Sequence, residues 1–136
     1  MPHATWERTR QVNLDGSFYV VQAVANQMKT QIPQGGSIIG ISSISALVGG
    51  EFQCHYAPTK AAILSLMQSC AVALGKYNIR ANAILPGTIA TDINKEDLAD
   101  VVKRENMIKG PRWADLERRM TLQDLWSSWR VTWRSM

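Results

Sequence analysis

Apolar residues recur at intervals of three and four near the start of the chain, which is the spacing of one face of an α-helix. The pattern covers residues 5–30. Its apolar stripe includes Val12, Phe18, Val21 and Ala25. Gln34–Gly36 interrupts the pattern, and the short apolar run Ser37–Ile41 that follows predicts a buried strand.

The middle of the chain repeats this alternation of helix and strand. We expect a glycine-punctuated loop over residues 46–53 and a helix over residues 56–76, with Pro58 tolerated in the first turn. This helix is apolar almost all round, which indicates burial on more than one side. Residues 79–85 form the next predicted strand, and residues 91–109 a polar, mostly helical segment. Strand, helix and strand at this spacing predict parallel pairing in an α/β layer fold.

Length and composition restrict the class of protein. A chain of 136 residues, 46% of them apolar, is at most one globular domain. Cys54 and Cys70 show neither metal-ligand nor disulfide spacing, which fits a reducing, intracellular setting. The start shows no signal peptide, and the longest apolar stretch, Ala61–Leu74, is shorter than the roughly 20 residues that a bilayer requires. We expect a cytoplasmic protein without a membrane partner.

A tyrosine and a lysine four residues apart, Tyr56 and Lys60, stand at the start of the second helix. Positions four apart share one helix face, so the ammonium can approach the phenol. A cation roughly 5 Å away, at an effective dielectric of about 20, stabilises the phenolate by about 3 kcal/mol. Such a tyrosine can exchange a proton with an alcohol near neutral pH. Taken alone, the pair also fits a solvated lysine that extends past a ring.

The surrounding residues carry a resemblance. The runs GGSIIGISSISALVGG and HYAPTKAAILSLMQSCAVALGKYNIRANAILPGTIATD, with WERTRQVNLDGSFYVVQAVANQM upstream, resemble the short-chain dehydrogenase/reductase family. The match covers residues 5 to about 109. The serine and tyrosine segments are most similar to fungal L-rhamnose 1-dehydrogenases. The resemblance implies an α/β fold with a partial Rossmann-like, doubly wound parallel sheet.

The resemblance also implies roles for individual residues. Tyr56 would be the general base toward the substrate hydroxyl, and Ser43 would hydrogen-bond the same oxygen. Lys60 would stabilise the phenolate and hold the nicotinamide ribose, and Asn13 would keep a water in the proton relay to Lys60. The loop that packs on the nicotinamide would contain Pro86, Gly87, Thr88 and Ile89.

Each of these residues has a purely structural alternative. Ser43 could be a turn residue at the end of a strand, Asn13 a satisfied polar group in a helix, and Pro86 part of a plain turn. Their joint occurrence at the family's spacing favours the functional interpretation. Cys54 and His55, beside the tyrosine, are better interpreted as loop residues.

One family feature is missing from the sequence. The family places a glycine-rich turn after its first strand, where backbone amides hold the cofactor pyrophosphate. Here Gly35–Gly36 precedes a strand and Gly49–Gly50 lies in a loop. We therefore expect residues 1–109 to be a partial catalytic domain that lacks the nucleotide-binding half. Both NAD and NADP stay open as cofactor, because the selecting residue belongs to that half.

The composition changes abruptly after about residue 109. Residues 110–136 hold four of the five tryptophans and no lysine, and they contribute half of the net charge of +4. In a shifted reading frame, Trp113–Ala114 forces a glycine and Met120–Thr121 an aspartate, both where the family has them. We interpret the segment as a frameshifted, non-native tail, so its charge gives no reason to expect a nucleic-acid partner. An amphipathic helix that binds a partner or a membrane surface is the alternative.

Three functions follow from these patterns. The first is a fragment of an NAD(P)-dependent oxidoreductase that acts on a small molecule, in the sugar case an aldose oxidised at C1 to a lactone. The second is an inactive, truncated product that at most forms oligomers, because the family pairs subunits through helices matching residues 5–30 and 56–76. The third is a binding module formed by the tail. The family resemblance implies no metal, and we expect the truncated chain itself to be inactive.

Overall fold

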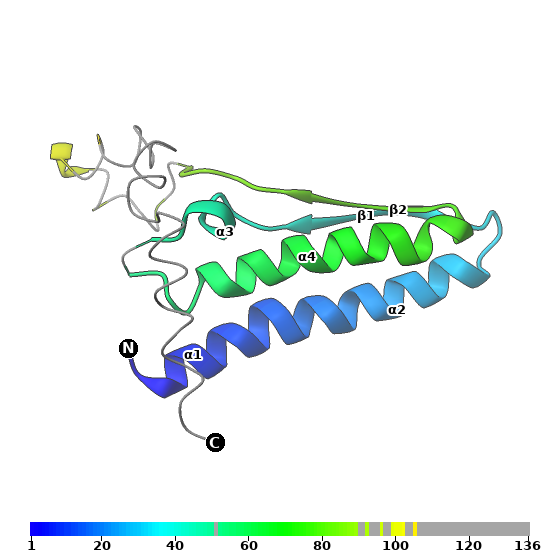
Figure 1. Ribbon diagram of the computed structural model, residues 1–136, viewed down its shortest axis with the longest axis horizontal. Helices are drawn as coiled ribbons and strands as arrows, with labels where there is room; N and C mark the ends of the chain where they lie inside the picture. The colour runs from blue at the N-terminus through cyan, green and yellow to red at the C-terminus, as the bar shows by residue number, and fades with distance from the viewer. Residues whose placement is uncertain (51, 90–91, 93–95, 97–98, 103–104, 106–136) are drawn as a thin grey trace, which may run out of the picture. The chain divides into compact units, whose positions relative to one another are not determined.

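The computed structural model describes residues 1–50, 52–89, 92, 96, 99–102 and 105 (Figure 1). The chain divides into two compact units, Met1–Gly87 and Thr88–Met136. The helices and strands described below all belong to the first unit. The segments predicted over residues 91–109 and 110–136 lie largely or wholly outside the described residues.

The first unit begins with a long helical segment, as the 5–30 pattern predicts. It consists of α1 (His3–Arg10), a π-helical turn η1 (Gln11–Asp15) and α2 (Gly16–Thr30). The π-turn is a feature that the apolar spacing does not predict. An ion pair spans it, since Arg10 Nη1 lies 2.6 Å from Asp15 Oδ2. Figure 1 shows α1, η1 and α2 as one continuous helical segment, with the π-turn near its middle.

Two parallel strands form the sheet. Strand β1 (Gly36–Ile41) pairs with β2 (Ile79–Ile84), with Ile38 opposite Ala81 and Ile41 opposite Ile84. The crossover between them is α4 (Ala57–Leu74), followed by the 3₁₀ turn η2 (Gly75–Tyr77). The predicted parallel pairing and α/β layering are thus confirmed.

The chain enters β1 through a close approach to the turn that precedes β2. Gly35 has φ +116°, and a Cβ at this position would lie 2.5 Å from the carbonyl oxygen of Asn78. The amide of Gly36 donates to the same carbonyl at 3.2 Å. A glycine is required at position 35 for both its backbone conformation and its space.

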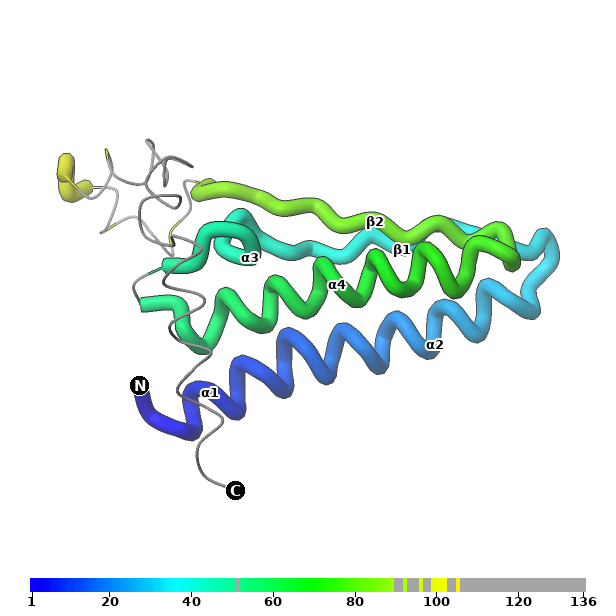
Figure 2. Tube along the Cα trace, in the orientation of Figure 1, coloured from blue at the N-terminus to red at the C-terminus, as the bar shows by residue number. Residues whose placement is uncertain are grey.

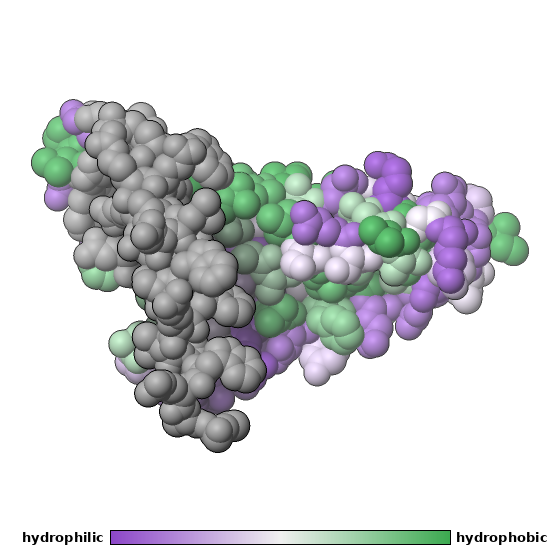
Figure 3. Space-filling view, viewed as in Figure 1, coloured by the Kyte–Doolittle hydropathy of each residue, from purple (hydrophilic) through white to green (hydrophobic). Residues whose placement is uncertain are grey.

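Helix α4 lies between the sheet and α2 (Figures 1 and 2). The core that joins the three layers consists of Ala25, Ile38, Met67, Leu74, Ile79 and Ala81. The prediction that α4 is buried on more than one side is not confirmed, because its buried residues, Thr59, Ile63, Met67 and Leu74, share one stripe of the helix. Its remaining face is open, and Val72 is 87% exposed. Figure 3 shows hydrophobic side chains among hydrophilic ones on the visible face of this unit.

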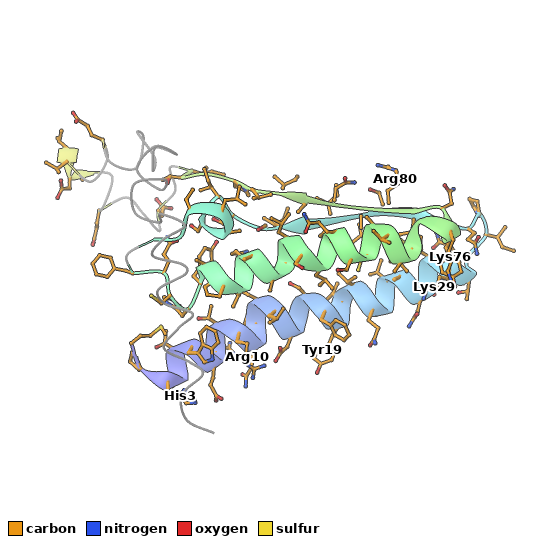
Figure 4. All side chains as sticks on the ribbon, viewed as in Figure 1. His3, Arg10, Tyr19, Lys29, Lys76 and Arg80 are labelled. Atoms are coloured by element: carbon orange, nitrogen blue, oxygen red, sulfur yellow. The ribbon has the colours of Figure 1, made fainter. Side chains whose placement is uncertain are left out.

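Two lysines lie at the end of the unit where α2 and α4 finish (Figure 4). The ammonium groups of Lys29 and Lys76 lie 5.3 Å and 5.2 Å from the ring centroid of Tyr77. Cations near helix C-termini stabilise the helix dipole, and the aromatic ring adds an attraction of its own. These lysines therefore have a structural role that accounts for their position.

Two expectations from the sequence need correction. The predicted loop over residues 46–53 contains a short helix, α3 (Ser45–Val48), which ends at Gly49 with φ 65°. The apolar helix is also longer than the stretch counted from the sequence. Residues Ala57–Tyr77 form 21 helical residues, enough by length and composition to cross a membrane, although α4 packs here against the sheet. The argument from length against a membrane span is therefore wrong.

Candidate active site

Two serines follow directly after β1, at its carboxyl end. Ser42 and Ser43 are 2% and 8% exposed. The Ser42 amide donates to the carbonyl of Ile84 at 2.8 Å, and its hydroxyl donates to the carbonyl of Lys60 at 2.7 Å. Ser42 therefore ties the strand end to both β2 and α4, which is a structural role.

Ser43 makes a different kind of contact. Its hydroxyl oxygen accepts a hydrogen bond from the amide of Ser45 at 3.2 Å, at the start of α3. This contact uses a lone pair of the oxygen, so the hydroxyl proton can still be donated to a bound molecule. Ser43 is therefore a turn residue at the end of β1, as the structural alternative predicts. Its hydroxyl proton is at the same time available for donation.

Tyr56 is the N-cap residue of α4, and Lys60 lies one turn later. The amide of Tyr56 donates to the carbonyl of Gln53 at 2.9 Å, which fixes where the helix starts. The ammonium of Lys60 lies 5.4 Å from the ring centroid of Tyr56. The predicted approach of the ammonium to the tyrosine is confirmed with respect to the ring.

The Lys60 ammonium is also held by the strand. It donates to the carbonyl of Ile41, the last residue of β1, at 3.0 Å. Partial burial lowers the pKa of Lys60 below its ordinary value of 10.5. The contact places the ammonium beside the strand end from which Ser43 follows, and so brings the tyrosine, lysine and serine segments together.

Asn13 lies in the π-turn η1 and reaches α4. Its Nδ2 atom donates to the hydroxyl of Thr59 at 3.0 Å, and that hydroxyl donates to the carbonyl of Tyr56 at 2.7 Å. The carbonyl of Asn13 accepts a hydrogen bond from the Ser17 hydroxyl at 2.5 Å. Single π-turns within helices occur frequently at functional sites. The structure thus brings Asn13 to the start of α4 through Thr59.

The Pro86 segment begins alongside the serine segment. The amide of Ile44 donates to the carbonyl of Pro86 at 3.0 Å. A Cβ at Gly87 would meet no atom within 4 Å, so the backbone there is open on the side where the side chain would be. Thr88 and Ile89 belong to the second unit, and the structure does not place them relative to the other site residues.

A cavity of about 500 Å³ opens between the N-terminal helical segment, β1 and α4. Asn13 and Lys60 line it, together with apolar residues such as Val20, Val24 and Ile39. Tyr56 and Ser43 do not line it. The cavity is therefore an apolar groove that ends at two of the candidate residues, and it is not the place where a substrate would meet the phenol.

Three further residues lie just before the tyrosine. Gln53 Oε1 and His55 Nδ1 are buried without a hydrogen-bond partner among the described residues, and Cys54 is exposed. Among the described residues, no hydrogen bond joins the side chain of any of these three residues to Tyr56 or Lys60. Within those residues, no three His, Cys, Asp or Glu side chains gather in a way that could hold a metal ion.

Thr59 is a residue of this arrangement that the sequence analysis did not identify. It is 2% exposed and stands between Tyr56 and Lys60 in the sequence. The signal was present, because a hydroxyl in an otherwise apolar helix needs a hydrogen-bond partner once it is buried. Without the structure, nothing indicated that the partner lies 46 residues upstream.

Comparison with known proteins gives consistent matches. A family model for short chain dehydrogenases matches residues 1–101. The chain is 64% identical over 107 residues to the L-rhamnose 1-dehydrogenase (NAD(P)(+)) of Azotobacter vinelandii, covering 79% of this chain and 41% of that protein. It is 66% identical over 100 residues to the L-rhamnose-1-dehydrogenase of Scheffersomyces stipitis, covering 74% and 38%.

A solved structure agrees with these sequence matches. A short-chain type dehydrogenase/reductase from Mycobacterium ulcerans superposes with a TM-score of 0.70 at 36% identity, over 74% of this chain and 36% of that one. The chain thus spans about two fifths of the length of the curated relatives described here.

Proposed function

This chain belongs to the short chain dehydrogenase family, and from that premise we propose that it is the catalytic portion of an NAD(P)-dependent oxidoreductase that acts on a sugar hydroxyl. The observation that carries the proposal is the position of Lys60. Its ammonium lies 3.0 Å from the Ile41 carbonyl and 5.4 Å from the Tyr56 ring centroid. The same ammonium therefore donates a hydrogen bond to the end of β1 and lies near the Tyr56 ring.

In the proposed reaction, Tyr56 takes the proton from the substrate hydroxyl. The ammonium of Lys60, 5.4 Å from the ring centroid of Tyr56, supplies a positive charge near this base. Ser43 donates its hydroxyl proton to the same substrate oxygen and so orients it. Asn13 supports the relay of the proton toward Lys60. Each of these steps belongs to a side chain of the first unit, within the described residues.

The cofactor is NAD or NADP, and it supplies the hydride acceptor when bound. The donors present fit one end of such a molecule, since an ammonium and a phenol can hydrogen-bond ribose hydroxyls. Lys60 and Tyr56 would hold the ribose, and the Pro86–Ile89 loop would pack on the nicotinamide. The described residues include no glycine-rich turn that opens a helix, which is the arrangement that holds a pyrophosphate.

The substrate proposed is L-rhamnose or a related aldose, oxidised at C1 to the lactone. Support comes from the relatives in Azotobacter vinelandii and Scheffersomyces stipitis, whose names state L-rhamnose 1-dehydrogenase activity. A reaction between a free sugar and a nicotinamide cofactor fits the cytoplasm, where we place the protein. No nucleic acid or membrane takes part in this proposal.

The test uses a completed chain. It joins this chain to the parts of the Azotobacter vinelandii relative that lie outside the match at both ends. We expect it to reduce NAD or NADP in the presence of L-rhamnose, measured as nicotinamide absorbance. Absence of turnover with every aldose tried, from a completed chain that is folded and binds cofactor, would refute the proposal.

The chain of 136 residues is expected to be inactive by itself. Hydride transfer requires the nicotinamide to be held at near-attack distance, and the described residues include no glycine-rich turn opening a helix that could hold the cofactor phosphates. A titration with NADH should show no saturable fluorescence enhancement at micromolar concentration. Saturable enhancement would show that the chain supplies enough of the cofactor site by itself.

A second candidate function is association through α2 and α4. A cavity of about 330 Å³ lies between these helices, and its lining includes the apolar residues Phe18, Leu66 and Cys70 together with polar residues of α2. Phe18 is 45% exposed, so part of this surface lacks cover within the described chain. We propose that a second copy of the chain packs there, with this face paired to itself around a two-fold axis.

Light scattering after size exclusion tests this association. Ala73→Glu places a charge in the lining of this surface, whereas Val72→Glu places one at a neighbouring position outside the lining. We expect Ala73→Glu to shift the chain toward the monomer and Val72→Glu to leave the dimer intact. Equal effects of the two substitutions would contradict a dimer through this face.

A further inference from the structure

Thr59 has a buried hydroxyl for which the proposed reaction gives no role. The residue is 2% exposed and lies in the first turn of α4, three residues after Tyr56 and directly before Lys60. A hydroxyl removed from water needs hydrogen-bond partners, or its burial destabilises the fold. Its partners therefore show what the residue does.

The hydroxyl makes two hydrogen bonds whose directions can be assigned. The Tyr56 carbonyl lies 2.7 Å away and can only accept, so the single hydroxyl proton of Thr59 is donated to it. The lone pairs that are left on the oxygen accept from the Asn13 amide at 3.0 Å. Because the hydroxyl proton is already used, the group facing Thr59 must be the NH₂ of Asn13.

This assignment sets the orientation of the Asn13 side chain. The two branches of an amide differ in function, since one donates and the other accepts. With Nδ2 bound to Thr59, the Oδ1 atom lies on the other branch and stays available as an acceptor. Asn13 and Lys60 line the same groove, so an acceptor on Asn13 is what a water between the two residues requires.

The same contact also bears on Tyr56. The Tyr56 carbonyl receives the Thr59 hydroxyl and, at 3.1 Å, the amide of Lys60. The backbone that carries the phenol and the ammonium is therefore connected through Thr59 to the π-turn of another helix. A change at this hydroxyl would affect the candidate base and the relay residue together.

We propose that Thr59 is a positioning residue, which orients the Asn13 amide and fixes the first turn of α4 through one shared hydroxyl. The proposal concerns how residues of the proposed function are held, and its catalytic consequence rests on that function. The contact itself lies within the first unit and does not depend on any activity.

The first measurement uses the chain as it exists. In a ¹⁵N-labelled sample, Thr59→Val should move the side-chain NH₂ resonances of Asn13 and speed their exchange with water, while Thr59→Ser should keep both close to the original values. Thr9→Val is the matched control. It removes another helix hydroxyl, one that is exposed and donates to the Thr5 carbonyl at 2.8 Å.

The second measurement uses the completed chain. Loss of one hydrogen bond of this kind corresponds to roughly a tenfold effect, so Thr59→Val should lower kcat about tenfold with little change in KM. The pH dependence of kcat should shift as the relay is disturbed. Thr59→Ser should restore kcat to within about threefold, and Thr9→Val should leave both parameters unchanged.

The outcomes separate the two proposals. Unchanged Asn13 resonances in Thr59→Val would overturn the positioning role, whatever the activity. An effect of Thr59→Val that falls on KM and stability, with kcat and its pH profile unchanged, would also overturn it and leave a structural role. A completed chain that is folded and inactive with Thr59 intact would overturn the proposed function and, with it, the catalytic consequence of this contact.

Discussion

Gly40→Ala tests whether the distance between β1 and α4 is set by the absence of a side chain. Gly40 lies in β1 on the face that meets α4. A Cβ added there would lie 2.7 Å from Met67 Cγ and 3.0 Å from Ile63 Cγ2. Distances this short force the neighbours to move. Met67 is 1% exposed and, with Ile63, lines the apolar groove, so a shift of both side chains toward the groove sets the lower end of the cost.

The size of the effect follows from this crowding. Inserting a methyl group into a well-packed core destabilises a protein by about 1–3 kcal/mol. For a domain of this size, each kcal/mol lowers Tm by roughly 4–8 °C. Circular dichroism during thermal and urea unfolding of the full chain measures both quantities. The unfolding must be cooperative for the comparison to hold.

Gly75→Ala is the matched control for this substitution. Gly75 has φ −54° and ψ −38°, and a Cβ there would meet no atom within 4 Å. Alanine at such a position is expected to be neutral, or stabilising by about 0.4–1 kcal/mol. If Gly40→Ala lowers the unfolding free energy by no more than Gly75→Ala does, the inference that β1 packs closely on α4 at Gly40 is wrong.

A double substitution adds a direct check on Gly40. Met67→Ala alone should cost about 2–5 kcal/mol, because it leaves a cavity in the core. In that background the methyl group of Gly40→Ala has room, so it should cost less than it does alone. Strictly additive costs would show that the two side chains do not meet.

Three further predictions concern the site and the tail. In the completed chain, Tyr56→Phe should abolish turnover and largely spare cofactor affinity, whereas Lys60→Ala should impair both; equal losses of affinity, measured by cofactor titration, would contradict this division of roles. Burial lowers the pKa of Lys60 in the folded state, so the unfolded state binds more protons below pH 10.5. The unfolding free energy should therefore rise with pH between the lowered pKa of Lys60 and pH 10.5. Urea unfolding at several pH values should show this rise in the original chain and not in Lys60→Met. An equal rise in both proteins would show that the ammonium is fully solvated. Finally, with the N-terminal part restored, the shifted reading frame over residues 110–136 should give more soluble and more cooperative protein than the segment as written or its deletion; equal cooperativity of the written segment would favour an amphipathic helix there instead.

Much of the fold is encoded in local patterns. The 56–76 helix and the strand before it have apolar periodicities and lengths that specify each element, and both are confirmed within a few residues. The family resemblance and its similarity to L-rhamnose 1-dehydrogenases are confirmed by the matched relatives, and the partial Rossmann-like fold by the superposed structures. The family could be predicted because its short motifs, among them the Tyr56–Lys60 pair and the serine after the first strand, stand at fixed spacing in the sequence.

The features that were missed depend on contacts between distant segments or on backbone detail. The π-turn at Asn13 leaves the apolar stripe unchanged in sequence, so periodicity does not reveal it. Helix α3 has only four residues, fewer than a periodic pattern needs. The length argument against a membrane span failed because it counted only Ala61–Leu74, whereas the helix runs from Ala57 to Tyr77. The roles of Asn13, Ser43, Tyr56 and Lys60 stay predictions, of which the substitutions described above test those of Tyr56 and Lys60.

Lys60 is joined to the end of β1 at two atoms, and this restricts how α4 can move. Its carbonyl accepts the Ser42 hydroxyl at 2.7 Å, while its ammonium donates to the Ile41 carbonyl at 3.0 Å. Sliding the helix along the strand would break the first contact, and rotating it about its axis would carry the ammonium away from the second. The two hydrogen bonds therefore hold the first turn of α4 in place against the end of β1. A displacement of α4 that keeps both hydrogen bonds is confined to the part of the helix beyond this turn, which contains Met67 and Leu74.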